Sequence, residues 1–510
     1  MQYIADANEA KEIDGISIRQ IGIPSFVLME RAAMKVADCV YRVMDHEHGK
    51  VLAICGMGNN GGDGVAAARI LMERGCQVEL AYIGNKEHAS EEMMTQMEIA
   101  SKLSIPIADS LEMEKYDVII DAIFGIGLSR EIKGEYHKMI QQINQSGAHV
   151  VSVDIPSGVD ATTGKVFGIA VKADDTVTFG VNKRGLVLFP GAQYAGKVHV
   201  EEIGFPKKAL EEVSPKVISY ERDDILKIFP KRIPCSNKGT YGRILVIAGS
   251  EHMGGAALFA ALAAYRMGSG LVKVFTHENN RVMLQSKLPE ALLTTYGQAA
   301  SSKEEWEQIE RSLQDAIEWA TTIVIGPGLG TSCIAKKMLN IVLKQKDIPT
   351  VIDADGLNLL AEDRKYFDTE KKLSLSPDFV LTPHVKEMSR LTGKSVADIK
   401  ENIIESAKNP TGQNVIVLKD ARTVVYDGSK DRTYLNLSGN NALAKGGSGD
   451  VLSGMIGGLL ALQMSPFEAA SLGVYLHGLT AEEYVKERGY SSMLASDILE
   501  ELKKLLPYIK

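Results

Sequence analysis

The chain has 510 residues, of which 45% are hydrophobic and 24% are charged, and its formal net charge is −8. This composition is ordinary for a globular protein with buried cores and excludes disorder over most of the length. At roughly 150 residues per domain, about two to four domains are expected. Because binding to a phosphate backbone needs an excess of Lys and Arg, the acidic balance argues against a nucleic-acid partner.

The five cysteines are odd in number and form no C-x-x-C pair. This pattern favours reduced thiols in a cytoplasmic protein over a disulfide framework or a zinc ribbon. The opening residues, MQYIADANEAKEID, lack the basic and apolar regions of a signal peptide. No apolar run reaches the length of about 18 residues that a membrane span requires, so no membrane association is expected.

Short apolar runs alternate with helical patterns in the first part of the chain, which is typical of βαβ units around a mainly parallel sheet. The patterns predict helices at Ser25–Tyr41, Gly64–Arg74 and Ser90–Ser101. They predict strands at Val51–Cys55, Gln77–Ile83, Asp117–Asp121 and His149–Asp154.

The same rhythm restarts near residue 240. Helices are expected at Gly254–Met267 and Val451–Leu462, and strands at Arg243–Ala248, Leu271–Phe275, Thr322–Ile325, Thr350–Asp353, Phe379–Leu381, Val415–Lys419 and Thr423–Tyr426. The proline-containing, charged segment Lys207–Asn237 separates the two series. We therefore expect two α/β domains, residues 1–215 and 225–510, joined by a linker at 216–224.

A glycine-rich loop, residues 56–64 (GMGNNGGDG), follows the first of these strands. Its first, third and sixth residues have the spacing of a dinucleotide-binding fingerprint, and Glu79 lies where a ribose-binding acid would be expected. A tight turn that needs only glycine's freedom is the plain alternative. Asn59, Asn60 and Asp63 add side-chain oxygens to a helix start suited to anions. The loop therefore indicates a site for a nucleotide together with a charged group.

Two further polar loops, Asp121–Glu131 and Asp154–Gly158, leave strands of the same sheet. Because ligands of open α/β sheets bind beyond the carboxyl ends of the strands, all three loops should converge on one crevice. The oxygens of Asn60, Asp121 and Ser157 suit a hard cation. Each of these residues alone could equally be a cap or turn residue.

The segments Leu28–Ala32, Gly58–Gly64 and Asp154–Gly158 closely resemble the NAD(P)H-hydrate epimerase family, over roughly residues 1–215. The resemblance implies a Rossmann-like three-layer α/β/α fold. It also implies that Asp154 contacts the substrate as the acid/base group and that Asn60, Asp121 and Ser157 hold a potassium ion. The implied lining of the hydrated-nicotinamide site is Asn59, Asn60, Gly61, Gly62, Asp63, Gly125, Ile126, Gly127, Leu128, Ser129, Arg130 and Glu131.

A second glycine-rich string, Asn440–Asp450, precedes the predicted helix at Val451. The backbone amides of Gly446–Gly449 can form an anion hole for a phosphoryl group in transfer. Asp450 is placed to take a proton from an attacking hydroxyl. The string is not a Walker A loop, because Lys445 precedes the glycines. A simple helix cap would need one such residue and not the whole string.

Other loops of the second half also follow predicted strands: Gly326–Gly330, Asp353–Asn358 and Thr382–His384. A lone histidine is usually structural, but the position of His384 beside two other loops favours a substrate contact. Asp355 and Asn358 could equally be turn residues. Lys419–Thr423 joins two strands, and its amides and basic side chains could hold an adenine nucleotide.

These loops and Asn440–Asp450 resemble the ribokinase-like superfamily and, within it, the nucleotide-dependent NAD(P)H-hydrate dehydratases, over roughly 225–510. The resemblance implies a ribokinase-like three-layer α/β/α domain that uses Mg²⁺ and ADP, with ATP left open. It assigns the hydrated substrate to Ala256, Gly328, His384 and Asp450. It assigns the nucleotide to Lys419, Asp420, Ala421, Arg422, Thr423, Gly446, Gly447, Ser448 and Gly449.

Together the two resemblances imply a repair enzyme for the hydrated nucleotides NADHX and NADPHX. The first domain would interconvert the R and S epimers, and the second would dehydrate the S form at the expense of ADP. A homo-oligomer is expected. Three alternatives stay open: a small-molecule kinase in the second half, a non-catalytic nucleotide-binding or interaction module in the first, and a dehydrogenase.

Overall fold

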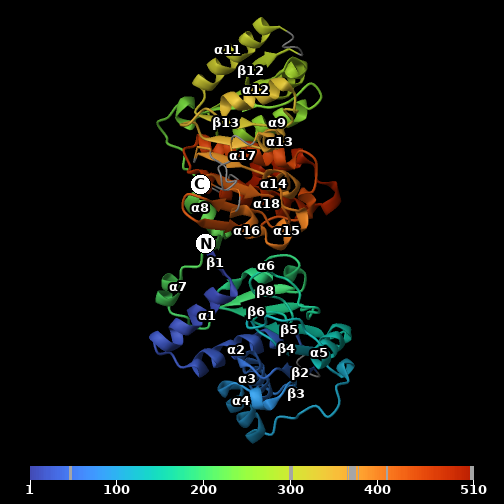
Figure 1. Cartoon of the computed structure of the whole chain (residues 1–510). Helices are drawn as coiled ribbons and strands as arrows, with labels where there is room; N and C mark the ends of the chain where they lie inside the picture. The colour runs from blue at the N-terminus through green and yellow to red at the C-terminus, as the bar shows by residue number, and fades with distance from the viewer. Residues whose placement is uncertain are drawn as a thin grey trace. The chain divides into compact units, whose positions relative to one another are not determined.

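The structure is a computed structural model that describes residues 1–44, 49–297, 302–363, 366, 375–376, 378–408, 410 and 412–505. The chain divides into two compact units, Gln2–Val217 and Ile218–Lys510, with Met1 joined to the second (Figure 1). The segment expected as a linker carries regular structure, because β9 (Val217–Ser219) lies within it. Among the described residues, no helix is long and apolar enough to cross a membrane.

The N-terminal unit is built on a six-stranded sheet in the order β3-β2-β4-β5-β6-β8, and every neighbouring pair is parallel. Its strands are β2 (Lys50–Cys55), β3 (Gln77–Tyr82), β4 (Val118–Ala122), β5 (His149–Val153), β6 (Asp175–Phe179) and β8 (Lys197–Glu201). The four predicted strands are confirmed to within one residue at each end. The sequence analysis missed β6 and β8, whose polar residues interrupt the apolar pattern.

Helices cover both faces of this sheet. α2 (Ser25–Val43), α3 (Asn59–Glu73) and α4 (Glu91–Lys102) lie along one face, and α5 (Gly134–Gln145) lies on the other (Figure 1). The smaller elements are β1 (Gln2–Ala5), paired in parallel with β7 (Asn182–Lys183), and the helices α1 (Ala7–Gly15), α6 (Arg184–Val187) and α7 (Lys207–Val213).

The start of α3 corrects the sequence prediction. The helix was expected from Gly64, but it begins at Asn59, with Gly58 as its N-cap. Asn59 to Asp63 therefore form its first turn rather than a loop before it. An added Cβ at Gly61 would lie 1.9 Å from the Gly56 carbonyl oxygen. The glycines therefore allow the helix start to pack directly on the end of β2.

The C-terminal unit contains the strand order β12-β11-β10-β13-β14-β15-β16-β17-β18, followed by β9. The pairs from β12 to β16 are parallel, and β16-β17 and β17-β18 are antiparallel. The strands are β10 (Arg243–Ile247), β11 (Leu271–His277), β12 (Leu292–Tyr296), β13 (Thr322–Ile325), β14 (Thr350–Ile352), β15 (Phe379–Leu381), β16 (Val415–Leu418), β17 (Val424–Asp427) and β18 (Arg432–Leu435). The seven predicted strands are confirmed, and β12 and β18 were missed.

One face of this sheet packs against α9 (Gly254–Arg266), α17 (Ser448–Ala461), α18 (Pro466–Glu487) and α19 (Ala495–Leu505) in a single apolar core. α17 begins at Ser448, three residues before its predicted start, so Asp450 lies in the first turn. The remaining helices are α8 (Ile225–Ile228), α10 (Arg281–Lys287), α11 (Lys303–Trp319), α12 (Cys333–Val342), α13 (Asp355–Glu362), α14 (Val385–Thr392), α15 (Val396–Glu401) and α16 (Ile403–Lys408).

Candidate active sites

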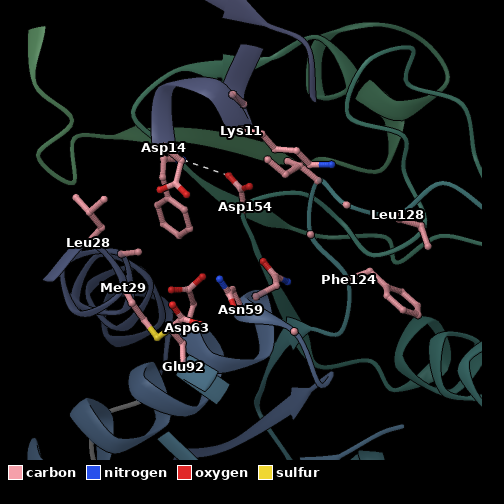
Figure 2. Close-up of a pocket in the computed structure, with 18 of the residues that line it drawn as sticks. Lys11, Asp14, Leu28, Met29, Asn59, Asp63, Glu92, Phe124, Leu128 and Asp154 are labelled. Atoms are coloured by element: carbon pink, nitrogen blue, oxygen red, sulfur yellow. Dashed lines mark hydrogen bonds between the residues drawn. The ribbon is translucent and has the colours of Figure 1, made fainter. Parts of the chain in front are cut away.

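A pocket of about 1020 Å³ opens beyond the carboxyl ends of the strands in the N-terminal unit (Figure 2). Three of the predicted segments meet there: the first turn of α3, the loop after β4 and the residue that follows β5. The expected residues that line it are Asn59, Asn60, Asp63, Gly125, Ile126, Gly127, Leu128, Ser129, Arg130 and Asp154.

Three residues of the predicted set do not line this pocket. Gly61 and Gly62 are buried inside the start of α3, and an added Cβ at Gly62 would lie 2.8 Å from the Met29 Cε atom. They allow close packing beneath the pocket. Glu131 lies outside it, with its carboxylate 2.8 Å from the Lys133 ammonium group.

Asp154 is held rigidly at the pocket wall. Its backbone has a φ of 63°, a conformation that non-glycine residues adopt only when their surroundings enforce it. Its Oδ1 atom accepts hydrogen bonds from Lys183 Nζ at 2.7 Å and from Thr178 Oγ1 at 2.9 Å. Lys183 also donates to the Phe179 carbonyl. Among the residues that the structure describes, the hydrogen bonds to this carboxylate are accepted by Oδ1, which leaves Oδ2 for a bound molecule.

The pocket gathers three further acids that face Asp154. Figure 2 shows the Asp14 and Asp154 side chains approaching the pocket from one side, and those of Asp63 and Glu92 from the other. Burial and the charges of Asp154, Asp14 and Glu92 raise the pKa of Asp63 well above its usual range. Burial and Asp154 likewise raise the pKa of Asp14. When protonated, Asp63 can donate a hydrogen bond beside the ion pair of Asp154 and Lys183.

Asp14, Glu92 and Lys183 were missed by the sequence analysis. No motif contains them, because they come from α1, α4 and β7 and meet only in the folded chain. A lone lysine 29 positions after Asp154 carries no signal of its own.

Asp121 and Ser157 lie beneath the pocket and are fully buried. Asp121 accepts from Ser157 Oγ at 2.6 Å, from Ser157 N at 2.9 Å and from Ser152 Oγ at 2.8 Å. Burial raises the pKa of Asp121, and only neutral donors oppose that rise. Asn60 lies against the loop that follows β4. A Cβ added at Gly125 in this loop would lie 3.1 Å from Asn60 Oδ1. A buried carboxylate without a cationic partner among the described residues, surrounded by oxygens, fits a monovalent cation.

In the C-terminal unit, an ion pair between the buried Asp353 and the half-buried Lys419 lies under the start of α17. Lys419 Nζ is 2.8 Å from Asp353 Oδ1, and Ser453 Oγ donates to Asp353 Oδ2. An added Cβ at Gly449 would lie 3.5 Å from Lys419 Nζ. The basic residue expected at the nucleotide thus sits beneath the helix start, where its charge reinforces the positive end of the helix.

Asp450 stands in the first turn of α17, above this pair. Burial, together with the charges of Asp353 and Asp355, raises the pKa of Asp450 to about 6, against the opposing influence of Lys419. A carboxylate with a pKa near 6 is ionised at neutral pH and binds a proton more strongly than an ordinary aspartate. That is the property of an effective general base.

His384 caps α14. Its Nδ1 atom accepts hydrogen bonds from the backbone of Lys386 and Glu387, and Glu387 Oε2 accepts from the His384 N–H at 2.8 Å. Burial and nearby Lys419 lower the pKa of His384, and burial raises that of Glu387 to about 7. His384 is thus a neutral helix cap whose exposed side can still meet a ligand.

The remaining residues of the C-terminal unit were expected either at the hydrated substrate or at the nucleotide. Gly328 has a φ of 57°, and an added Cβ there would lie 2.8 Å from that of Ala256. Asp355 Oδ2 accepts from the Gly330 N–H at 2.8 Å. Ala421 is exposed, Asp420, Arg422 and Thr423 are half-buried, and Gly446 at the tip of the second glycine string is open to solvent.

A mainly parallel α/β sheet with a glycine-rich helix start, an acid in the first turn of that helix and a lysine beneath it is typical of a ribokinase-like domain. Comparison with a solved structure agrees. A ribokinase-like superfamily protein from Enterococcus faecalis matches 57% of this chain and 96% of its own, with a TM-score of 0.50 and 28% identity.

Comparisons of sequence cover both units. A family model described as NAD(P)H-hydrate dehydratase matches residues 244–504, and one described as YjeF-related protein N-terminus matches residues 25–185. The bifunctional NAD(P)H-hydrate repair enzyme of Coxiella burnetii is 36% identical over 99% of this chain and 100% of its own. That of Thermofilum pendens is 34% identical over 99% of this chain and 96% of its own. The chain therefore belongs to the family of bifunctional NAD(P)H-hydrate repair enzymes.

Proposed function

We propose that the N-terminal unit interconverts the R and S epimers of NADHX and NADPHX. We further propose that the C-terminal unit dehydrates the S epimer to NADH or NADPH at the expense of ADP, yielding AMP and phosphate. The observation that carries the proposal is the presence in one chain of two acids at strand or helix ends, each near a lysine: Asp154 beside Lys183, and Asp450 above the pair of Asp353 and Lys419.

In the epimerase pocket, Asp154 is the group that moves a proton. Lys183 and Thr178 fix its Oδ1 atom, which directs Oδ2 toward the substrate. Loss and return of configuration at the hydroxyl-bearing carbon requires one group that takes a proton and one that gives it. Asp154 takes the proton, and Asp63, when protonated, donates a hydrogen bond to the polar end of the substrate. The apolar wall formed by Leu28 and Met29 excludes water from the ring.

The oxygens of the half-buried Asn60 and the buried Asp121 and Ser157 suit a potassium ion. When bound, it would supply a fixed positive charge that neutralises Asp121 beneath the pocket floor. Independently of the ion, the Ser157 hydroxyl accepts from the Phe124 N–H at 2.9 Å and so fixes the loop that carries Gly125 to Arg130.

In the dehydratase unit, Asp450 removes the proton from the substrate hydroxyl while that oxygen attacks the terminal phosphorus of ADP. The bond from this phosphorus to the bridging oxygen of ADP breaks, and AMP leaves. The amides of Gly446 to Gly449 stabilise the charge on the phosphoryl group. Phosphate then leaves with the electron pair of the C–O bond, assisted by the lone pair of the ring nitrogen. Loss of a proton from the neighbouring ring carbon of the resulting iminium ion forms the C=C bond and restores the reduced nicotinamide.

The nucleotide is expected against Lys419–Thr423 and the start of α17. Mg²⁺ would enter with the phosphates of the nucleotide and offset their charge. Asp353 is already paired with Lys419 and Ser453. His384, Ala256 and Gly328 would border the hydrated nicotinamide.

The test is to identify the product. The protein is incubated with S-NADHX, Mg²⁺ and ADP or ATP, and reduced-nicotinamide absorbance and free phosphate are followed together. Release of equal amounts of NADH and phosphate supports the proposal, and the faster nucleotide is the donor. A stable phosphorylated product without NADH would instead indicate an ordinary small-molecule kinase. Parallel reactions with S-NADPHX establish the preferred substrate. We expect the protein to act in the cytoplasm as a homo-oligomer.

A further inference from the structure

A second cluster of ligand-type side chains lies in the N-terminal unit, away from the pocket. One potential ligand atom each from Cys39, Asp175 and His199 lies within 4.8 Å of the other two. Cys39 comes from the last turns of α2, Asp175 is the first residue of β6, and His199 lies in β8. Three separate elements thus bring a thiol, a carboxylate and an imidazole together.

Asp175 is the centre of this cluster. Its Oδ1 atom is 2.5 Å from His199 Nε2, and its Oδ2 atom is 2.7 Å from Nε2 of His149, the first residue of β5. Cys39 and Asp175 are buried, while the His149 side chain retains 33% exposure. The cluster therefore has a solvent-accessible side through which a small ion can enter.

The cluster is separate from the proposed epimerase site. None of Cys39, His149, Asp175 and His199 lines the pocket. His149 and Asp175 begin β5 and β6, whereas Asp154 and its partner Phe179 lie at the other ends of the same strands. The cluster is thus at the amino edge of the sheet, and the established activity makes no use of it.

The chemistry of the three groups selects a borderline-soft divalent metal. Thiolate, imidazole and carboxylate are the three ligand types that zinc accepts, and hard cations such as Mg²⁺ avoid sulfur. One thiolate and one carboxylate neutralise the two positive charges of the ion, which suits a buried position. The nearby charges are Arg42, which faces Cys39, and Glu201, whose carboxylate is 2.9 Å from Lys35 Nζ.

We propose that Cys39, Asp175 and His199 form a site for Zn²⁺ or a metal of the same class, with a water molecule as the fourth ligand. His149 is a positioning residue, because it holds the second oxygen of Asp175 and so orients the first toward the metal. The ion replaces the hydrogen bond between His199 Nε2 and Asp175 Oδ1, with the imidazole proton carried on Nδ1, and binding releases the thiol proton of Cys39 to solvent.

A metal at this position would tie α2 to β6 and β8. The first half of α2 contributes Leu28, Met29 and Ala32 to the pocket wall. The metal would therefore hold in place a helix whose other end borders the pocket. The proposed role of the metal is structural. This proposal does not depend on which reaction the pocket performs.

Cobalt spectroscopy tests the proposal with the full chain. The protein is treated with a chelator, freed of it and titrated with Co²⁺. We expect one Co²⁺ per chain, with an intense near-ultraviolet band from thiolate-to-cobalt charge transfer and visible bands typical of four-coordination. Added Zn²⁺ should abolish both signals by displacement. Absence of stoichiometric binding, or binding without the thiolate band, would overturn the proposal.

Variants assign the ligands. Cys39→Ser should remove the charge-transfer band, and His199→Gln should weaken binding by at least about 100-fold. Cys76→Ser is the matched control, because Cys76 is another free cysteine of this unit outside the cluster, and it should leave the titration unchanged. His149→Gln should keep the band and weaken binding by about 10-fold to 100-fold. An unchanged band in Cys39→Ser would contradict the site.

A measurement on the wild-type chain tests the site even if the variants do not fold. X-ray absorption of the zinc-loaded wild-type chain should show one sulfur scatterer at about 2.3 Å and nitrogen or oxygen scatterers at about 2.0 to 2.2 Å. The melting temperature of the wild type should also rise with added Zn²⁺. A zinc shell without sulfur would overturn the proposal, whatever the variants show.

Discussion

Lys183 Nζ lies 2.7 Å from Asp154 Oδ1, and only 3% of the Lys183 side chain is exposed. The two residues come from different parts of the N-terminal unit, yet they form a buried ion pair that also includes Thr178. A buried carboxylate that must remain ionised needs such a partner. The pair explains how Asp154 can serve as a base in a pocket that also contains Asp14, Asp63 and Glu92.

Replacement of Lys183 should therefore damage both stability and epimerisation. Lys183→Met leaves the Asp154 charge buried and unpaired, which costs about 3 to 5 kcal/mol in the free energy of unfolding. Epimerisation should fall by at least about 100-fold, while dehydration of pure S-NADHX continues at the wild-type rate. The measurements are thermal unfolding and the two separate rates. Lys172→Met, at an exposed position of the same unit, is the control. Wild-type epimerisation in Lys183→Met would show that the pair is dispensable.

The dehydration rate, plotted against pH, should fall on the acidic side of about pH 6, forming an acidic limb. Asp450 acts as a base only when ionised, and its pKa is raised to about 6. The rate should therefore fall about tenfold per pH unit below pH 6. Because the charge of Asp355 contributes to the raised pKa, Asp355→Asn should move the limb to lower pH. The measurement is the rate of NADH formation from S-NADHX against pH.

The control for this shift is Glu362→Gln, on an exposed side chain at the other end of the same helix, α13. It should leave the limb at the wild-type position. A limb that stays in place in Asp355→Asn would contradict the assignment of the titrating group to Asp450.

Two glycines of α17 should respond differently to alanine. At Gly449 an added Cβ has its nearest neighbour at 3.5 Å, which is an ordinary contact, whereas at Gly454 it would lie 2.1 Å from the Ala260 carbonyl oxygen. Gly449→Ala should fold normally but obstruct the phosphoryl site and slow dehydration by about 100-fold. Gly454→Ala should lose about 1 to 3 kcal/mol of stability because α9 and α17 are forced apart. Thermal unfolding and the dehydration rate, measured for each variant, distinguish the two effects. A fully active Gly449→Ala would argue against phosphate binding at this helix start.

Two serines distinguish a potassium ligand from a structural hydrogen bond. Ser157 and Ser152 each donate one hydroxyl hydrogen bond to Asp121, at 2.6 and 2.8 Å. Alanine at either position should cost about 1 to 2 kcal/mol of stability. Only Ser157→Ala should also weaken the stimulation of epimerisation by K⁺, measured at constant ionic strength with Na⁺ as the replacement ion. An equal potassium response in the two variants would remove Ser157 from the ligand set.

The positions of several candidate residues in the fold could be predicted from the sequence where a local rule applied. Asp154 and Asp121 were identified because they follow strands of a parallel sheet, and the structure places Asp154 on the wall of the pocket and Asp121 beneath it. Asp450 was identified because it follows a glycine-rich string, and it does lie in the first turn of α17. These positions depend on where strands end and helices begin, and the pattern of apolar residues and glycines in the sequence indicates both.

Features that depend on tertiary packing were not predictable. The start of α3 was predicted at Gly64. Asn and Gly are weak helix formers, so the preceding residues carry little helical signal. The helix nevertheless begins at Asn59, since its glycines pack on Gly56 and Met29. Similarly, Lys419 was expected at the nucleotide because of its charge. Only the fold shows that it pairs with Asp353, 66 residues away.

The central claim is that two separate acids perform two successive steps. It is tested most directly by following the return of reduced-nicotinamide absorbance from a mixture of both NADHX epimers, with K⁺, Mg²⁺ and ADP or ATP. The wild type should restore the signal of both epimers, and Asp154→Asn should rapidly restore only the S fraction. Asp450→Asn should restore neither. If the wild type restores nothing with either nucleotide, or if Asp154→Asn matches it on both epimers, the two-step account is contradicted.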